Sequence, residues 1–183
     1  FMFFEQKVLE KIESLKDLTE ALLDGNYADV LEQADDINIP VSDFDKYKFW
    51  NKSHYTRNCI VKDDFFELIL LCWEPGQKTK IHCHNQQECW VKVIEGGFSE
   101  SVYEQAEESG EMQFVSTDVV SQNEVTTVEN HDVFHSLENI NRGQSMSLHL
   151  YMKPITQCMY YDEESKDLKK VELSYYSFEG EKV

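Results

Sequence analysis

The sequence predicts an all-β barrel with a small helical cover at its N-terminal end, and three observations support this. From Tyr55 onward, short strand-like runs follow one another, separated by turn residues such as Pro75-Gly76. Before that point, apolar residues recur at helical spacing between residues 5 and 34. The chain of 183 residues is long enough to bury one proper core. Many short strands in a chain of this length favour a sandwich or a barrel.

The cover is expected to contain three helices. An apolar stripe predicts the first, and Gly25-Asn26 ends it. A short second helix follows, and Ser42 is placed to cap a third helix that runs to Tyr47. The apolar positions of the first two helices are Val8, Leu9, Ile12, Leu15, Leu18, Leu22, Tyr27, Val30 and Leu31.

The barrel is expected to begin directly after the cover. Its predicted strands are residues 55–62, 66–73, 79–84, 89–95, 98–104, 112–117, 125–129, 133–138, 145–152, 158–162 and 168–176. We therefore expect one domain over residues 1–183, in which residues 1–50 form the cover and residues 51–183 form the barrel.

Two separated stretches carry the histidines of one candidate metal site. His82 and His84 are two residues apart, so on a strand they point to the same side. His135 follows 51 residues after His84, which is far enough for another strand to return beside the first. Three neutral imidazoles on one side of a cation leave its other side open, which suits iron or another first-row metal.

The spacing around these histidines resembles the two signatures of the cupin superfamily. The pattern Gly76-x5-His82-x-His84-x4-Cys89-x6-Gly96 resembles the first signature, with Cys89 where most cupins have a metal-binding glutamate. His135-x3-Asn139 resembles the end of the second signature, although Asn130-His131-Asp132 lacks the usual Pro-x-Gly. The resemblance implies a double-stranded β-helix, or jelly-roll, barrel with the metal inside it.

Two further motifs narrow the resemblance to one family of cupins. Ser147, His149 and Tyr151 share one face of a predicted strand, opposite two leucines, which is typical of a strand that lines a cavity. Tyr55 and Arg57 likewise share a face. From about Trp50 to Asp162, these motifs and the histidines occur in the order found in cysteine dioxygenase, which the chain resembles.

That resemblance implies an enzyme that oxidises L-cysteine with O2 to cysteine sulfinic acid at a ferrous ion, Fe(2+). His82, His84 and His135 would be the metal ligands. Arg57, with Tyr55 beside it, would hold the substrate carboxylate, because a guanidinium matches a carboxylate with two parallel hydrogen bonds.

The resemblance also implies roles for the remaining motif residues. Cys89 and Tyr151 correspond to the pair that is joined by a thioether in animal cysteine dioxygenases. Ser147 and His149 would orient the Tyr151 hydroxyl near the substrate. The family's Ser-Pro-Pro after this tyrosine is replaced by Met152-Lys153-Pro154, which leaves the backbone there to be determined.

Several alternatives stay open at the level of the sequence. Glu88 is a rival to Cys89 for the glutamate position, and Trp73 fits either the core or the pocket wall. His54 and His131 are expected to face solvent. The rival functions are a dioxygenase of another small thiol such as 3-mercaptopropionate, a different cupin enzyme, and a non-catalytic metal-binding cupin. Relatives that use 3-mercaptopropionate typically have glutamine at the position of Arg57 and glycine at that of Cys89.

Composition sets the expected surroundings. A net charge of -18 argues against nucleic acid and anionic membrane surfaces as partners. No run of 18 apolar residues and no signal peptide are found in the sequence, so we expect no membrane association. Five cysteines without regular spacing favour a reducing, cytoplasmic setting. A monomer is expected.

Overall fold

The structure is a computed structural model that describes residues 10–84, 87–128 and 133–183. Its helical elements are α1 (Leu15–Leu23), α2 (Tyr27–Glu32) and the 3-10 helix η1 (Val41–Tyr47). Its strands are β1 (Thr56–Lys62), β2 (Phe66–Trp73), β3 (His82–Cys83), β4 (Cys89–Glu95), β5 (Gly97–Gln105), β6 (Met112–Ser121), β7 (Val125–Val128), β8 (Phe134–Asn139), β9 (Ser145–Met152), β10 (Gln157–Asp162), β11 (Asp167–Glu172), β12 (Ser177–Phe178) and β13 (Glu181–Lys182).

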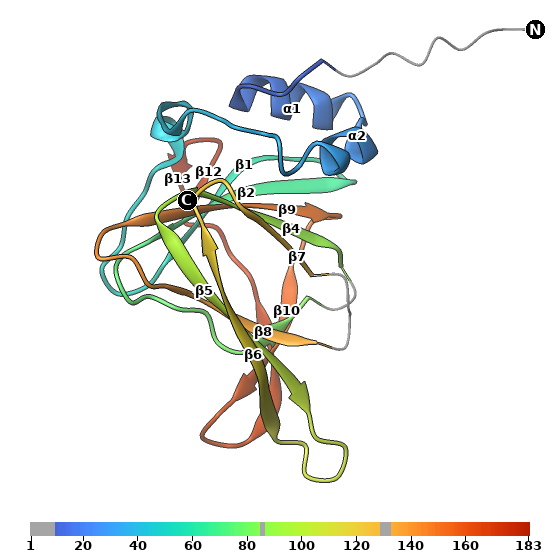
Figure 1. Cartoon of the computed structure of the whole chain (residues 1–183), viewed down its shortest axis with the longest axis vertical. Coiled ribbons are helices and arrows are strands. Elements are labelled where there is room, and N and C mark those ends of the chain that lie inside the picture. The colour runs from blue at the N-terminus through green and yellow to red at the C-terminus, as the bar shows by residue number, and fades with distance from the viewer. Residues whose placement is uncertain (1–9, 85–86, 129–132) are drawn as a thin grey trace, which may run out of the picture.

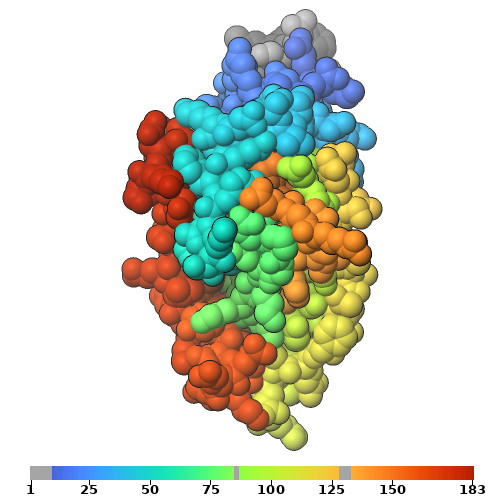
Figure 2. Space-filling view, turned by 90° about the vertical axis from the view of Figure 1, so that its left-hand side faces the viewer, coloured from blue at the N-terminus to red at the C-terminus, as the bar shows by residue number. Residues whose placement is uncertain are grey.

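The strands form two facing sheets, and the prediction of an all-β barrel is confirmed. One sheet has the order β13-β12-β1-β2-β9-β4-β7, and the other has the order β11-β10-β3-β8-β5-β6. Helices α1 and α2 lie over the outer face of the first sheet (Figure 1). Figure 2 shows this cover at one end of the molecule and the β5–β6 and β10–β11 hairpins at the other.

The cover explains why β2, β4 and β9 of the first sheet are buried on both faces. On β2, Leu68 and Leu70 belong to the core that packs under the helices, whereas Ile69 and Leu71 belong to the core inside the barrel. The side chains of a strand alternate between faces, so a strand between two cores is buried at every position. All eight residues of β2 are accordingly buried.

The first helix is shorter than its apolar spacing predicts. In the described residues, α1 begins at Leu15, and Ser14 caps it by accepting a hydrogen bond from the backbone N–H of Asp17. Ile12 lies before this cap, outside the helix, and is nevertheless buried. Val8 and Leu9 lie outside the described residues. The third helix is η1, which follows Pro40 rather than being capped by Ser42.

Three predicted strands differ from the observed strands by more than one residue at an end. Only His82 and Cys83 of the predicted strand 79–84 form β3, because its ladders to β8 and β10 are that short. The predicted strand 112–117 extends to Ser121, since β6 pairs with β5 along the whole of β5. The predicted strand 168–176 ends at Glu172 and continues as an irregular segment.

Among the described residues, no helix is both long enough and apolar enough to cross a membrane.

Candidate metal centre

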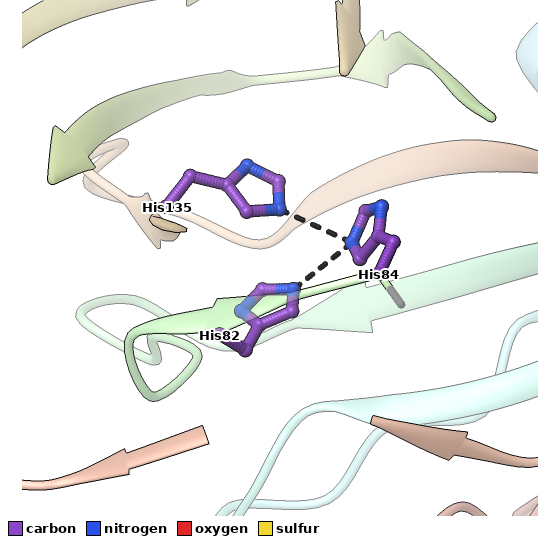
Figure 3. A group of neighbouring side chains, drawn as sticks. All are labelled: His82, His84 and His135. Atoms are coloured by element: carbon purple, nitrogen blue, oxygen red, sulfur yellow. Dashed lines mark hydrogen bonds between the residues drawn. The ribbon is translucent and has the colours of Figure 1, made fainter. Parts of the chain in front are cut away.

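The three predicted metal ligands come together inside the barrel. His82 on β3 pairs directly with His135 on β8, and His84 follows the end of β3. The Nε2 atom of His84 lies 3.1 Å from Nε2 of His82 and 3.1 Å from Nε2 of His135. Figure 3 shows the three rings directed toward one another. Their possible ligand atoms all lie within 4.8 Å of one another, which is close enough to share one cation.

Hydrogen bonds on the far sides of two rings determine where their protons lie. The Nδ1 atom of His82 donates to the carbonyl of Lys80 at 2.9 Å, and Nδ1 of His135 donates to Glu100 at 2.9 Å. In the neutral form, each of these rings therefore presents an Nε2 lone pair to the centre. A neutral His84 carries one proton, so it can donate a hydrogen bond to only one of the two Nε2 lone pairs of His82 and His135. A shared cation therefore suits the centre better than hydrogen bonds among the rings.

Burial keeps the His82 and His84 rings neutral. It lowers the pKa of His82 to about 3, and it lowers the pKa of His84 well below the usual range. The neutral imidazole is the form that binds a metal. At neutral pH both rings are therefore ready to act as ligands without first losing a proton.

Glu100 on β5 is a residue of this centre that sequence reasoning missed. One carboxylate oxygen accepts from His135, and the other accepts from Thr126 Oγ1 at 2.6 Å. Burial raises the pKa of Glu100, but these hydrogen bonds outweigh burial and leave it below the usual range. The available signal was weak: Glu100 lies two residues after the buried Phe98 and shares its face of the strand.

The histidines open into a cavity of about 390 Å³. Its wall includes Tyr55, Arg57, His149 and Tyr151, so four of the other predicted site residues face the same space. This volume is in the range of small-molecule sites.

Arg57 presents an unused donor. Its Nη1 donates to the carbonyl of Ser174 at 2.8 Å, whereas its Nη2 is buried without a hydrogen-bond partner among the described residues. A buried, charged donor without a partner is costly, and an anionic ligand in the cavity would satisfy it.

Ser147 and His149 belong to a hydrogen-bond chain that starts at Trp73. The indole Nε1 can only donate, and it donates to Ser147 Oγ at 2.9 Å. The Ser147 hydroxyl lies 2.8 Å from His149 Nε2, within hydrogen-bond distance. His149 is neutral, because burial lowers its pKa to about 3. Trp73 is thus a fully buried core residue that orients the site from behind.

Cys89 and Tyr151 are directly opposite each other on the neighbouring strands β4 and β9. Both side chains are buried, and burial raises the pKa of the Cys89 thiol and of the Tyr151 hydroxyl. The Tyr151 hydroxyl therefore keeps its proton at neutral pH and is available as a hydrogen-bond donor.

The remaining candidates take simpler positions. Glu88 is exposed and lies outside the histidine cluster, so it does not replace Cys89 in the barrel interior. His54 is exposed, as expected. His131 lies outside the described residues.

The chain resembles known proteins over most of its length. The family described as "Cysteine dioxygenase type I" matches residues 6–164. Cysteine dioxygenase type 1 of Danio rerio is 26% identical over 190 residues, which cover 98% of this chain and 94% of that protein. The Homo sapiens protein of the same name is 30% identical over 137 residues, which cover 73% of this chain and 66% of that protein.

A solved structure shares the fold at low identity. The TT1209 protein of Thermus thermophilus is 14% identical, with a TM-score of 0.50 over 61% of this chain and 94% of that one. At this identity the likeness concerns the fold alone.

Proposed function

This chain belongs to the cysteine dioxygenase type I family, and we propose that it is an iron enzyme that oxidises L-cysteine to cysteine sulfinic acid with dioxygen. The observation that carries the choice of substrate is the unpartnered Nη2 of Arg57, which belongs to the same cavity wall as the three histidines. One cavity thus offers a centre for a metal and a separate cation for a carboxylate.

The donor set supports iron as the metal. His82, His84 and His135 would hold it through their Nε2 atoms, and no carboxylate of the described residues joins the cluster. Imidazoles suit ferrous iron, and a site without an anionic protein ligand leaves positions for small ligands. When bound, the iron supplies the redox chemistry that joins both oxygen atoms to the thiol sulfur.

The protein's own part is to bind and orient the substrate. We propose that the buried Nη2 of Arg57 donates to the carboxylate of cysteine, with Tyr55 beside it in the wall. This contact fixes one end of a small molecule, which sets the direction of its thiol.

Tyr151 is proposed to donate a hydrogen bond within the cavity, since burial keeps its hydroxyl protonated. Its ring stacks on His149, with 6.2 Å between the ring centroids and an interplanar angle of 21°. The chain Trp73–Ser147–His149 holds the His149 ring in place. Ser147 is therefore a positioning residue behind the wall, and Tyr151 is the residue that reaches the substrate.

Two finer proposals concern the protein's surroundings. Four cysteines are buried thiols, at positions 59, 72, 89 and 158, which supports a reducing, cytoplasmic setting. We also propose that residues 1–183 form a single domain, with residues 1–50 as the cover and residues 51–183 as the barrel, and that it works as a monomer.

The test combines metal analysis with oxygen uptake. We expect iron in the purified protein and oxygen consumption with cysteine, and much less with cysteamine, which has the thiol and amine but no carboxylate. Comparison with 3-mercaptopropionate tests the rival thiol. Equal use of cysteine and cysteamine by the native protein would remove the proposed role of Arg57.

A matched pair of variants makes this test sharper. Arg57→Gln should lower the preference for cysteine over cysteamine by about 10- to 100-fold, as expected for the loss of a charge-assisted contact. Its iron content should not change, because Arg57 is not part of the histidine cluster. Arg142→Gln, at an exposed arginine, is the control and should behave as the native protein.

A further inference from the structure

A short irregular segment of the C-terminal region holds Arg57 from outside the barrel. This strap, residues 173–176, joins β11 to β12. Leu173 lines the cavity, and the Ser174 carbonyl accepts from Arg57 Nη1 at 2.8 Å. The backbone N–H of Tyr176 donates to the Arg57 carbonyl at 2.7 Å. The strap therefore fixes both the backbone and one end of the guanidinium.

Tyr175, in the middle of the strap, adds two contacts. Arg57 Cζ lies 5.6 Å from the centre of the Tyr175 ring, which is within the range of a cation–π contact. The Tyr175 hydroxyl donates to a carboxylate oxygen of Glu67, and it also accepts from Lys62 Nζ at 3.3 Å. The Tyr175 ring that contacts Arg57 is thus held by hydrogen bonds at its hydroxyl end.

Glu67 is a buried carboxylate in a strand that is otherwise apolar or sulfur-containing. It has 0% exposure, and its second oxygen accepts from the backbone N–H of Ile155 at 3.0 Å. Ile155 itself lines the cavity. Glu67 is not one of the clustered histidine ligands, nor is it among the residues that line the cavity. Burying a carboxylate is unfavourable unless each of its oxygens has a hydrogen-bond donor. Here Tyr175 and Ile155 supply one donor each.

We propose that Glu67 and Tyr175 are positioning residues for substrate specificity: they hold Arg57 so that Nη2 faces the cavity and Nη1 is used by the strap. This inference rests on the proposed role of Arg57 as the carboxylate site. A guanidinium recognises a carboxylate only in a fixed plane, so loosening the ring beneath it reduces recognition of the carboxylate more than it affects the metal centre.

Tyr175→Phe and Glu67→Ala are the principal variants. Both should raise KM for cysteine and lower the preference for cysteine over cysteamine by roughly tenfold, which corresponds to about 1.4 kcal/mol. The values of kcat with cysteine at saturation and the iron content should stay near those of the native protein. Calorimetric titration of the iron-loaded protein with cysteine in the absence of oxygen should show the same loss of affinity, independently of turnover.

Glu67→Gln separates positioning from mere packing. Its carbonyl can accept from Ile155, and its amide can donate to the Tyr175 oxygen once that hydroxyl turns. We therefore expect the glutamine variant to recover the preference for cysteine to within about threefold of native, a difference below about 1 kcal/mol. Tyr103→Phe, at a half-buried tyrosine against Phe114 on another part of the barrel, is the control and should change nothing.

The outcomes distinguish this inference from the proposed function. If Arg57→Gln leaves the preference for cysteine unchanged, the carboxylate site itself is wrong. If Arg57→Gln removes that preference while Tyr175→Phe and Glu67→Ala keep it, only the positioning role is wrong. A fall in thermal stability of these two variants with no change in preference would also overturn it, because their role would then be structural alone.

Discussion

At the scale of single residues, proton placement suits the histidine cluster to the metal that we propose it holds. The Lys80 carbonyl and the Glu100 carboxylate each accept the Nδ1 proton of one ring, which leaves Nε2 unprotonated. Such contacts fix both the tautomer and the direction of a ligand ring. The metal affinity of this centre should therefore depend on residues that never touch the metal.

Replacement of Glu100 tests this dependence. Glu100→Gln removes the negative charge from the partner of His135, and it should weaken binding of a divalent metal by about 10- to 100-fold. Competition with a chromophoric chelator measures the affinity. Glu104→Gln, at an exposed glutamate on the same strand, is the matched control. Equal affinity in all three proteins would mean that Glu100 has no part in the centre.

Cys89 and Tyr151 provide a second test at this scale. Because they are directly opposite on adjacent strands, a thioether can form between them without moving the backbone far. Forming this bond removes two hydrogen atoms, which dioxygen accepts. Native protein incubated with iron, cysteine and oxygen should show a fraction lighter by two hydrogen atoms in intact-mass measurement, and Cys89→Ala should not. A native sample that never becomes lighter would leave Cys89 as a packing residue.

At the scale of elements, one buried lysine adds hydrogen bonds to the apolar contact between the helical cover and the barrel. Lys92 on β4 is 1% exposed, and its Nζ donates to the carbonyl of Ala34 at 3.0 Å and to that of Asn123 at 2.8 Å. It thus connects the residues after α2 with the turn between β6 and β7. A buried ammonium group with several carbonyl partners holds their positions more firmly than apolar contact alone.

Lys92→Met should accordingly destabilise the protein, since it leaves buried carbonyls without their donor. We expect the free energy of unfolding to fall by about 1–3 kcal/mol, the usual effect of losing such a partner. Urea unfolding followed by tryptophan fluorescence measures the change. Lys170→Met, at an exposed lysine on β11, should stay within about 0.5 kcal/mol of native. A Lys92 variant as stable as this control would show that the cover is held by its apolar face alone.

At the scale of the whole molecule, buried ionisable groups set the pH range of stability. Burial lowers the pKa of His149 from 6.5 to about 3, so the unfolded chain binds a proton there that the folded chain does not. Stability is therefore lost as the pH falls below 6.5 toward 3. Burial raises the pKa of Cys59 from 9.0 to about 12 and that of Cys72 from 9.0 to about 11, so stability is also lost as the pH rises above 9.0.

The free energy of unfolding of the metal-free protein, measured across this pH range, checks the losses of stability at acid and at alkaline pH. We expect maximal stability between pH 6.5 and pH 9.0, the unfolded-state pKa values of histidine and cysteine. Each group contributes at most about 1.4 kcal/mol per pH unit. His149→Gln should make the loss of stability at acid pH less steep, although His82 and His84 still contribute to it, and should leave the loss at alkaline pH unchanged. If stability falls equally steeply with falling pH in this variant, groups other than His149 cause the loss of stability.

The sequence by itself determined the parts of this protein that depend on short spacings. Short strand-like runs between turn residues predicted an all-β barrel, and alternation along the strands placed His82 with His84 and Ser147 with His149 on common faces. The bounds of β2, β4 and β9 follow the predicted ones, because long apolar runs between turns leave little freedom. The family resemblance rested on the same motifs, and the match over residues 6–164 bears it out.

Only the tertiary structure decided which distant residues support these motifs. Glu67 and Tyr175 meet across 108 residues, and Glu100 meets His135 across 35. Neither pair has a spacing signal, because each contact follows from the register and neighbours of strands that the local sequence does not specify. A lone glutamate within a strand is expected to face solvent, and only a partner brought from elsewhere in the chain makes its burial favourable.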